Sequence, residues 1–114
     1  MTRGWLIGRF QPWHEGHQAM VEEILKERDK CTIVIKDAKM NKNNPYTVTQ
    51  VKTMIDYWID VKGYRWQVDA QIIYGDGEDL TVYYGRKVGW KFKEIKLDKK
   101  TEAISATKIR ECTT

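Results

Sequence analysis

The chain has little cysteine and no long hydrophobic run. Cys31 and Cys112 are the only cysteines in 114 residues, and their spacing matches neither a disulfide framework nor a metal-binding motif. The apolar stretches are far shorter than a membrane span, and charged residues and histidines interrupt residues 1–20, where a signal peptide needs an apolar segment. We therefore expect a cytoplasmic protein with no membrane partner.

Charge of one sign is not concentrated in any segment either. The net charge is +4 and the sequence pI is about 9.0, yet no run of like charges is longer than the pair Lys99-Lys100. A mildly basic surface suits an anionic ligand, and nucleic acid is the rival partner. The hydrophobic content of 41% is enough for a core, so we expect residues 1–114 to form a single domain.

Hydrophobic periodicity predicts alternating strands and helices in the first half of the chain. Residues 4–8 are apolar without interruption, as expected of a strand buried on both faces, and residues 31–35 are rich in β-branched side chains. Between these segments, apolar side chains recur at helical spacing at His17, Met20, Val21, Ile24 and Leu25. A strand, a helix and a strand at this spacing indicate a parallel sheet with a right-handed crossover.

The second half continues the same pattern. Thr47 and Gln50 form a capping-box pattern at the start of a helix that runs to about Asp60, and Gly63 is its stop signal. The apolar stripe of this helix comprises Val48, Val51, Ile55, Trp58 and Ile59. Strands are predicted over residues 68–73, 80–84 and 92–97, and Ser105 caps a short final helix. The fold class is therefore α/β.

The segment from Gly8 to His17, GRFQPWHEGH, joins the first strand to the first helix. Ligands of open α/β sheets bind at such junctions, where backbone N–H groups and the helix dipole attract phosphates. We expect His14 and His17 to donate hydrogen bonds to phosphates as negative charge develops, and Arg9 to add positive charge. Gly8 and Gly16 would let the backbone approach the ligand closely.

A second motif, ISATKIR, runs from Ile104 to Arg110. Ser105 and Thr107 offer donors at another helix start, and Arg110 is placed to clamp a leaving pyrophosphate. Lys39, Lys42 and Arg86 are further candidate phosphate contacts, for which surface charge is an equal explanation. A single histidine on an apolar stripe is more often a core residue, so the functional interpretation depends on the two motifs occurring together.

The segments GRFQPWHEGH and KKTEAISATKIRE resemble the signature motifs of the HxGH nucleotidylyltransferases, with Trp13 where phenylalanine is commoner. The resemblance implies a Rossmann-like, mostly parallel sheet of about five strands with helices on both faces. It also implies two sets of site residues. The catalytic set is His14, His17 and Arg110, and the nucleotide- and phosphate-binding set is Gly8, Arg9, Phe10, Gln11, Gly16, Ser105 and Thr107.

For the reaction, the resemblance implies transfer of a nucleoside monophosphate from CTP or ATP to a phosphorylated small-molecule acceptor. Pyrophosphate leaves, and Mg²⁺ is expected on the nucleotide, with no metal site in the protein itself. The longer match of the second motif favours a cytidylyltransferase, whereas the GRFQP lead-in supports a nicotinamide mononucleotide adenylyltransferase. Two functions of a different kind also fit these residues, a nucleotide-binding module without catalysis and a nucleic-acid binder.

The chain ends four residues after Arg110. The long closing helix of the resembled family has no counterpart in so short a segment. We therefore expect a homodimer or higher homo-oligomer, in which a partner subunit stabilises the final helix. The polar loop of residues 36–46, which carries Lys39 and Lys42, is the best candidate for a lid over the substrate.

Overall fold

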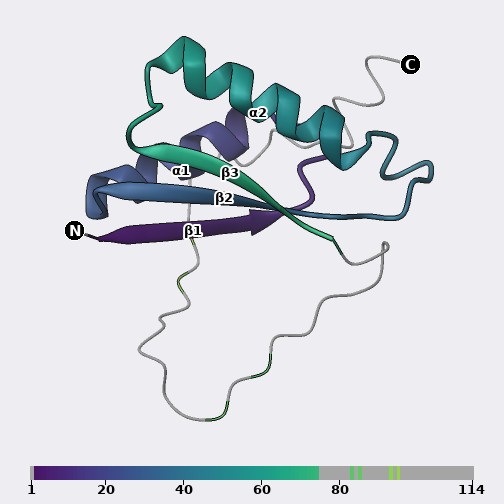
Figure 1. Ribbon diagram of the computed structural model, residues 1–114, viewed down its shortest axis with the longest axis horizontal. Helices are drawn as coiled ribbons and strands as arrows, with labels where there is room; N and C mark the ends of the chain where they lie inside the picture. The colour runs from purple at the N-terminus through teal and green to yellow at the C-terminus, as the bar shows by residue number, and fades with distance from the viewer. Residues whose placement is uncertain (1, 75–82, 84, 86–92, 94, 96–114) are drawn as a thin grey trace.

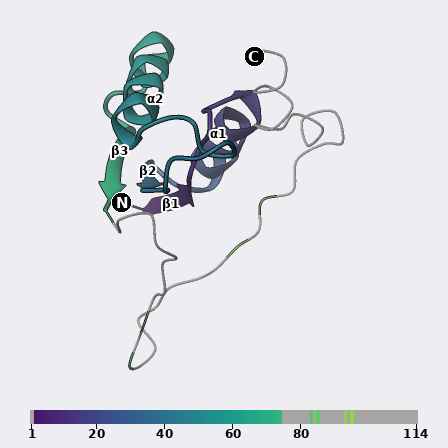
Figure 2. The same ribbon diagram turned by 90° about the vertical axis from the view of Figure 1, so that its right-hand side faces the viewer.

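The computed structural model describes residues 2–74 together with residues 83, 85, 93 and 95. In chain order the elements are β1 (Arg3–Gly8), α1 (Glu15–Glu27), β2 (Lys30–Lys36), α2 (Val48–Lys62) and β3 (Val68–Ile73). The three strands pair in parallel in the order β1-β2-β3 (Figure 1). Right-handed crossovers between successive neighbours place both helices on the same face of this sheet, as Figures 1 and 2 show.

Helix α2 begins and ends as its sequence predicts. The Thr47 hydroxyl accepts the Gln50 backbone N–H at 3.1 Å, and the Gln50 side chain accepts the Thr47 backbone N–H at 2.8 Å. Gly63 ends the helix with φ of 73°, in the left-handed conformation that glycine adopts without a steric cost. The buried positions of the helix all belong to the predicted stripe, at Val51, Ile55, Trp58 and Ile59.

Strand β2 is the centre of the core. Its side chains at Cys31, Ile33 and Ile35 are fully buried, and those at Thr32 and Val34 are at most 3% exposed, so both faces of the strand are covered. Burial raises the pKa of the Cys31 thiol to about 12, and Asp69 adds to the rise. The thiol is therefore protonated and structural, as the sequence predicts.

The expectation that the first strand is buried on both faces is wrong. Trp5 and Ile7 of β1 are 58% and 56% exposed, while Gly4, Leu6 and Gly8 alternate with them and face the helices. β1 is an edge strand of the sheet over the described residues, and both described helices cover the opposite face.

The strands predicted over residues 80–84 and 92–97 and the helix capped by Ser105 lie outside the described residues, apart from isolated positions. Within the described part of the chain, no helix has the length and apolar character needed to cross a membrane.

Gly4 sets how closely α1 approaches β1. A Cβ at this position would come closer to the Cγ2 atom of Ile24 than real Cβ atoms approach a neighbour. Because Ile24 is β-branched and stiff at χ1, its methyl group does not move aside easily. We expect Gly4→Ala to lower the free energy of unfolding by about 1–3 kcal/mol, the usual cost of overpacking.

The double variant Gly4→Ala/Ile24→Ala identifies the source of that cost. Without the Ile24 methyl groups, the alanine at position 4 has room, so the cost of Gly4→Ala is expected to be smaller in the Ile24→Ala background. Urea unfolding of the four proteins of this double-mutant cycle measures the difference. Equal costs in the two backgrounds would show that the crowding lies elsewhere.

Candidate active site

The chain reverses sharply between β1 and α1, and Gly8 and Phe10 shape the reversal. Phe10 has φ of 52°, a conformation uncommon outside glycine. Its ring packs over Gly8 so closely that a Cβ there would lie 3.0 Å from the ring atoms Cε1 and Cζ. The space beside Gly8, expected to admit a ligand, is therefore occupied by a side chain. Phe10, expected to line the nucleotide site, is 5% exposed and belongs to the core.

Aromatic side chains enclose His17 on several sides. The Trp13 ring stacks on the His17 imidazole at 5.5 Å between ring centres, and Phe10 meets it edge-on at 4.8 Å. Trp13 also contacts Trp58 of α2 edge-on at 5.4 Å, which links the start of α1 to the neighbouring helix. The His14 and His17 rings are nearly parallel, with centres 3.8 Å apart. The two histidines of the motif thus form one cluster at the start of α1.

Backbone hydrogen bonds fix both histidines at the N-terminus of α1. His14 is the N-cap residue, and its Nδ1 accepts the Gly16 backbone N–H at 3.0 Å. The Nδ1 atom of His17 accepts the His14 backbone N–H at 3.2 Å. A neutral imidazole that accepts at Nδ1 carries its proton on Nε2. Each ring therefore presents Nε2–H as a donor. The N–H of Gly16, a residue expected to let the backbone approach the ligand, donates to His14.

The site favours neutral histidines. Burial and, to a smaller extent, the neighbouring His14 lower the pKa of His17 from 6.5 to about 3. Burial also lowers the pKa of His14, although Glu15 acts in the opposite direction. Desolvation disfavours the charged imidazolium, and two charged rings at this separation would repel each other. At neutral pH the pair therefore offers hydrogen-bond donors without a formal positive charge.

Gln11 connects the motif to the segment before α2. Its side-chain amide donates to the Tyr46 carbonyl oxygen and accepts the Tyr46 backbone N–H, both at 2.9 Å. Gln11 is 5% exposed, and its two hydrogen bonds fix the backbone of residue 46. The Gln11–Tyr46 contact and the buried Asn44 anchor the end of the 36–46 loop. The buried Ala38 and the hydrogen bond from the Asp37 N–H to the Ile73 carbonyl oxygen anchor its beginning. No local sequence signal reveals a contact between residues 35 apart.

The candidate cations of the described region are accessible. Arg9, Lys39 and Lys42 are all exposed, Arg9 at the end of β1 and the two lysines in the loop after β2. Ser105, Thr107 and Arg110 of the second motif, and Arg86, lie outside the described residues. Over the part of the chain that the structure describes, no group of three or more metal-ligating side chains occurs.

A parallel sheet with an HxGH helix start beyond the carboxyl end of its first strand defines the class of the HxGH nucleotidylyltransferases. The chain belongs to the cytidylyltransferase-like family, whose model matches residues 5–62. That match includes the first motif and both described helices.

Several relatives are nicotinamide-nucleotide adenylyltransferases. The chain is 39% identical to the one from Methanoculleus marisnigri over 57 residues, which cover 48% of this chain and 34% of that protein. It is 42% identical to the one from Halobacterium salinarum over 57 residues, which cover 48% of this chain and 32% of that protein. The chain therefore spans about a third of the length of these relatives.

A solved structure shares the fold. It is a bifunctional NMN adenylyltransferase/ADP ribose pyrophosphatase from Francisella tularensis, in complex with AMP and a Mn ion. The TM-score is 0.52 at 30% sequence identity, over 65% of this chain and 22% of that one. The likeness supports the Rossmann-like, parallel α/β fold implied by the sequence motifs.

The low pKa of His17 predicts how stability depends on pH. The unfolded chain binds a proton at His17 near pH 6.5, whereas the folded chain does so only near pH 3. The stability due to neutral His17 is complete above pH 6.5 and is lost as the pH falls toward 3. The maximum slope for one such group is about 1.4 kcal/mol per pH unit.

Urea unfolding of the wild type and His17→Asn between pH 7.5 and 5 tests this prediction. Asparagine keeps an acceptor oxygen near the position of Nδ1 but does not titrate. We expect the wild type to lose more stability than the variant as the pH falls. Parallel pH profiles would mean that His17 titrates normally in the folded protein.

Proposed function

We propose that this chain forms the nucleotide-transfer site of a nicotinamide mononucleotide adenylyltransferase. The observation that carries the proposal is the pair of neutral imidazoles, each held at Nδ1 by a backbone N–H and each left with Nε2–H as a donor. Preorganised donors that need no rearrangement are what a phosphoryl-transfer transition state requires. Their place at a helix N-terminus beyond the strand ends adds the partial positive charge of the helix dipole.

The known relatives favour adenylyl over cytidylyl transfer. The second motif favours a cytidylyltransferase, but the relatives of this chain are named nicotinamide-nucleotide adenylyltransferases, and the similar solved structure contains AMP. We therefore take ATP as the donor and nicotinamide mononucleotide as the acceptor. The proposal therefore follows the first motif, which supports an adenylyltransferase, and not the second motif, which favours a cytidylyltransferase.

In this reaction a phosphate oxygen of the mononucleotide attacks the α-phosphorus of ATP. A new P–O bond forms to the α-phosphorus as the bond to the bridging oxygen breaks, and the electron pair of that bond leaves with pyrophosphate. The residues of this chain supply no nucleophile. The Nε2–H groups of His14 and His17 donate to oxygens on which charge increases, and Arg9, exposed directly after β1, provides a permanent positive charge.

A divalent cation, which we take to be Mg²⁺, would neutralise the nucleotide phosphates. The donor set of the described residues fits a cation carried mainly by the nucleotide and water, since these residues include no carboxylate cluster. A Mn ion accompanies AMP in the similar structure. The proposal also retains the cytoplasmic location and the homo-oligomeric state expected from the sequence. It likewise keeps Ser105, Thr107 and Arg110 as contacts of the nucleotide phosphates.

Product formation tests the substrate. We expect the chain, given ATP, nicotinamide mononucleotide and Mg²⁺, to release pyrophosphate and form the dinucleotide. CTP with glycerol 3-phosphate is the matched control pair. Turnover of the CTP pair alone would restore the cytidylyltransferase interpretation, and nucleotide binding without turnover of either pair would favour a non-catalytic module.

Asparagine variants separate catalysis from helix capping. Asparagine is a strong N-cap residue, so His14→Asn keeps an acceptor for the Gly16 N–H while it removes the Nε2–H donor. His17→Asn does the same for the His14 N–H. We expect each variant to fold and to lose about 10²–10³-fold in kcat, the usual effect of one transition-state donor. Thermal unfolding provides the folding control, and full activity in folded variants would show that the histidines only cap the helix.

A further inference from the structure

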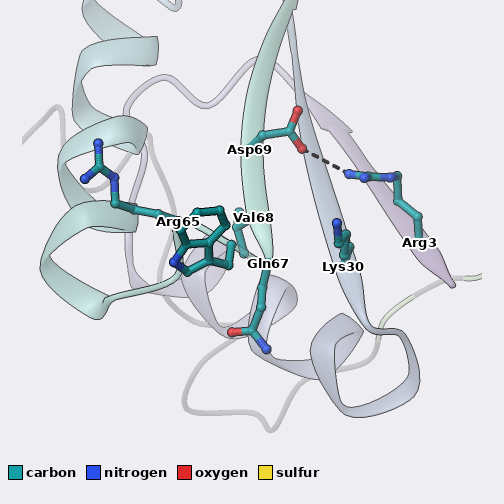
Figure 3. A pocket seen from close by; sticks show the side chains of 7 residues that line it. Arg3, Lys30, Arg65, Gln67, Val68 and Asp69 are labelled. Atoms are coloured by element: carbon teal, nitrogen blue, oxygen red, sulfur yellow. Dashed lines mark hydrogen bonds and ion pairs between the residues drawn. The ribbon is translucent and has the colours of Figure 1, made fainter. Parts of the chain in front are cut away.

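A hollow of about 230 Å³ opens at the end of the sheet opposite to the histidines (Figure 3). It lies where the strands begin, between Arg3 of β1, Lys30 of β2 and the residues that lead from α2 into β3. Figure 3 shows Arg3 and Lys30 on one side of the hollow and Arg65 on the other. The lining thus contains three cations and one carboxylate, that of Asp69.

The Asp69 carboxylate already has hydrogen-bond partners, whereas several nitrogen atoms of the cations have none. Oδ1 of Asp69 accepts the Thr32 hydroxyl at 2.7 Å and Nη1 of Arg3 at 3.2 Å, while Oδ2 accepts the Gln71 amide. These contacts use one nitrogen of the Arg3 guanidinium. Within the described part of the chain, Lys30 has no ion pair or hydrogen bond through its ammonium group. The hollow therefore favours an anion.

Arg65 also has guanidinium nitrogens without a hydrogen-bond partner among residues 2–74. Its Nε atom pairs with Asp60 at 3.2 Å, and its side chain is 77% exposed. The terminal nitrogens of the guanidinium have no partner among residues 2–74. Arg65 therefore adds positive charge to the lining of the hollow.

Trp66, which also lines the hollow, is 90% exposed. An indole that is open to solvent beside cations offers a face on which a nucleobase stacks. The volume is below the usual range for sites that enclose a whole ligand, so it suits a phosphate group whose attached ring lies outside on Trp66. One aromatic platform with one group of cations matches one nucleotide unit.

We propose that this hollow is a second anion site that binds a mononucleotide, with the phosphate on Lys30 and Arg3 and the base on Trp66. The site is separate from the histidine cluster, because Arg3 and Gly8 stand at opposite ends of β1, about 16 Å apart at the rise of a strand. A mononucleotide in the hollow therefore does not compete with the nucleotide that the histidines bind.

Titration of the ¹⁵N-labelled chain with AMP tests the proposal. The indole N–H signals report the two sites separately, Trp66 for the hollow and Trp13 for the histidine cluster, and a Trp66→Phe variant assigns the first. We expect AMP at millimolar concentrations to shift the Trp66 indole and the Val68 backbone amide. Inorganic phosphate should shift Val68 while it leaves the Trp66 indole nearly unchanged.

The variants have matched controls. Lys30→Gln and Trp66→Leu are each expected to weaken AMP binding, followed at Val68, by about tenfold. Lys26→Gln makes the same change of charge on the exposed side of α1, outside the hollow, and should leave the affinity unchanged. Trp66→Phe retains a ring and should retain most of the affinity.

Three results would overturn the proposal. The first is a response of Trp13 without one at Trp66 or Val68, which would assign all AMP binding to the histidine site. The second is equal weakening by Lys30→Gln and Lys26→Gln, which would indicate a general effect of net charge. The third is binding of a short single-stranded oligonucleotide at least about a hundredfold tighter than AMP, with shifts at the same residues. That result would make the hollow part of a nucleic-acid surface.

Discussion

The candidate site depends on two hydrogen bonds from backbone N–H groups to imidazole nitrogens at the start of α1. They give His14 and His17 a structural role as caps and a chemical role as donors, because each bond fixes the tautomer that places a proton on Nε2. Burial keeps His17 in its neutral form by holding its pKa far below neutrality. The donors are therefore ready before a ligand arrives, and they need no change of protonation to act.

The rest of the fold keeps this helix start in place. Gly4 lets α1 lie close against β1, and the Phe10 ring folds back over Gly8 to support the reversal between them. Trp13 joins the histidine cluster to α2 through Trp58. The buried β2 lies beneath both helices, so a shift of either helix would disturb contacts that also hold the histidines.

The sequence predicted the parts of the structure that follow from local spacing. The stripe of α2, the Thr47 cap, the Gly63 stop and the strand at 68–73 depend on neighbours a few residues away, and all are confirmed. Of the stripe of α1, Val21, Ile24 and Leu25 pack in the core as predicted. The sequence did not predict the contacts of Phe10 and Gln11, because a motif does not display which neighbours its side chains meet in the fold. Phe10 turns inward over Gly8, and Gln11 binds the backbone of Tyr46. The exposed face of β1 was missed for a related reason, since an apolar segment does not reveal where its strand lies in the sheet.

In the proposed reaction, neutral histidines leave the attraction of the anionic nucleotide to other groups. Hydrogen bonds from Nε2–H act over a short range and strengthen only as charge appears on the oxygen they contact, which favours the transition state over the free nucleotide. The same proposal gives the long-range attraction to the exposed Arg9, Lys39 and Lys42, whose charges salt screens beyond about 8 Å at physiological ionic strength. Binding of the nucleotide should therefore depend strongly on salt concentration, whereas the rate of the chemical step should depend on it only weakly. This division follows from burying the donors and leaving the cations in solvent.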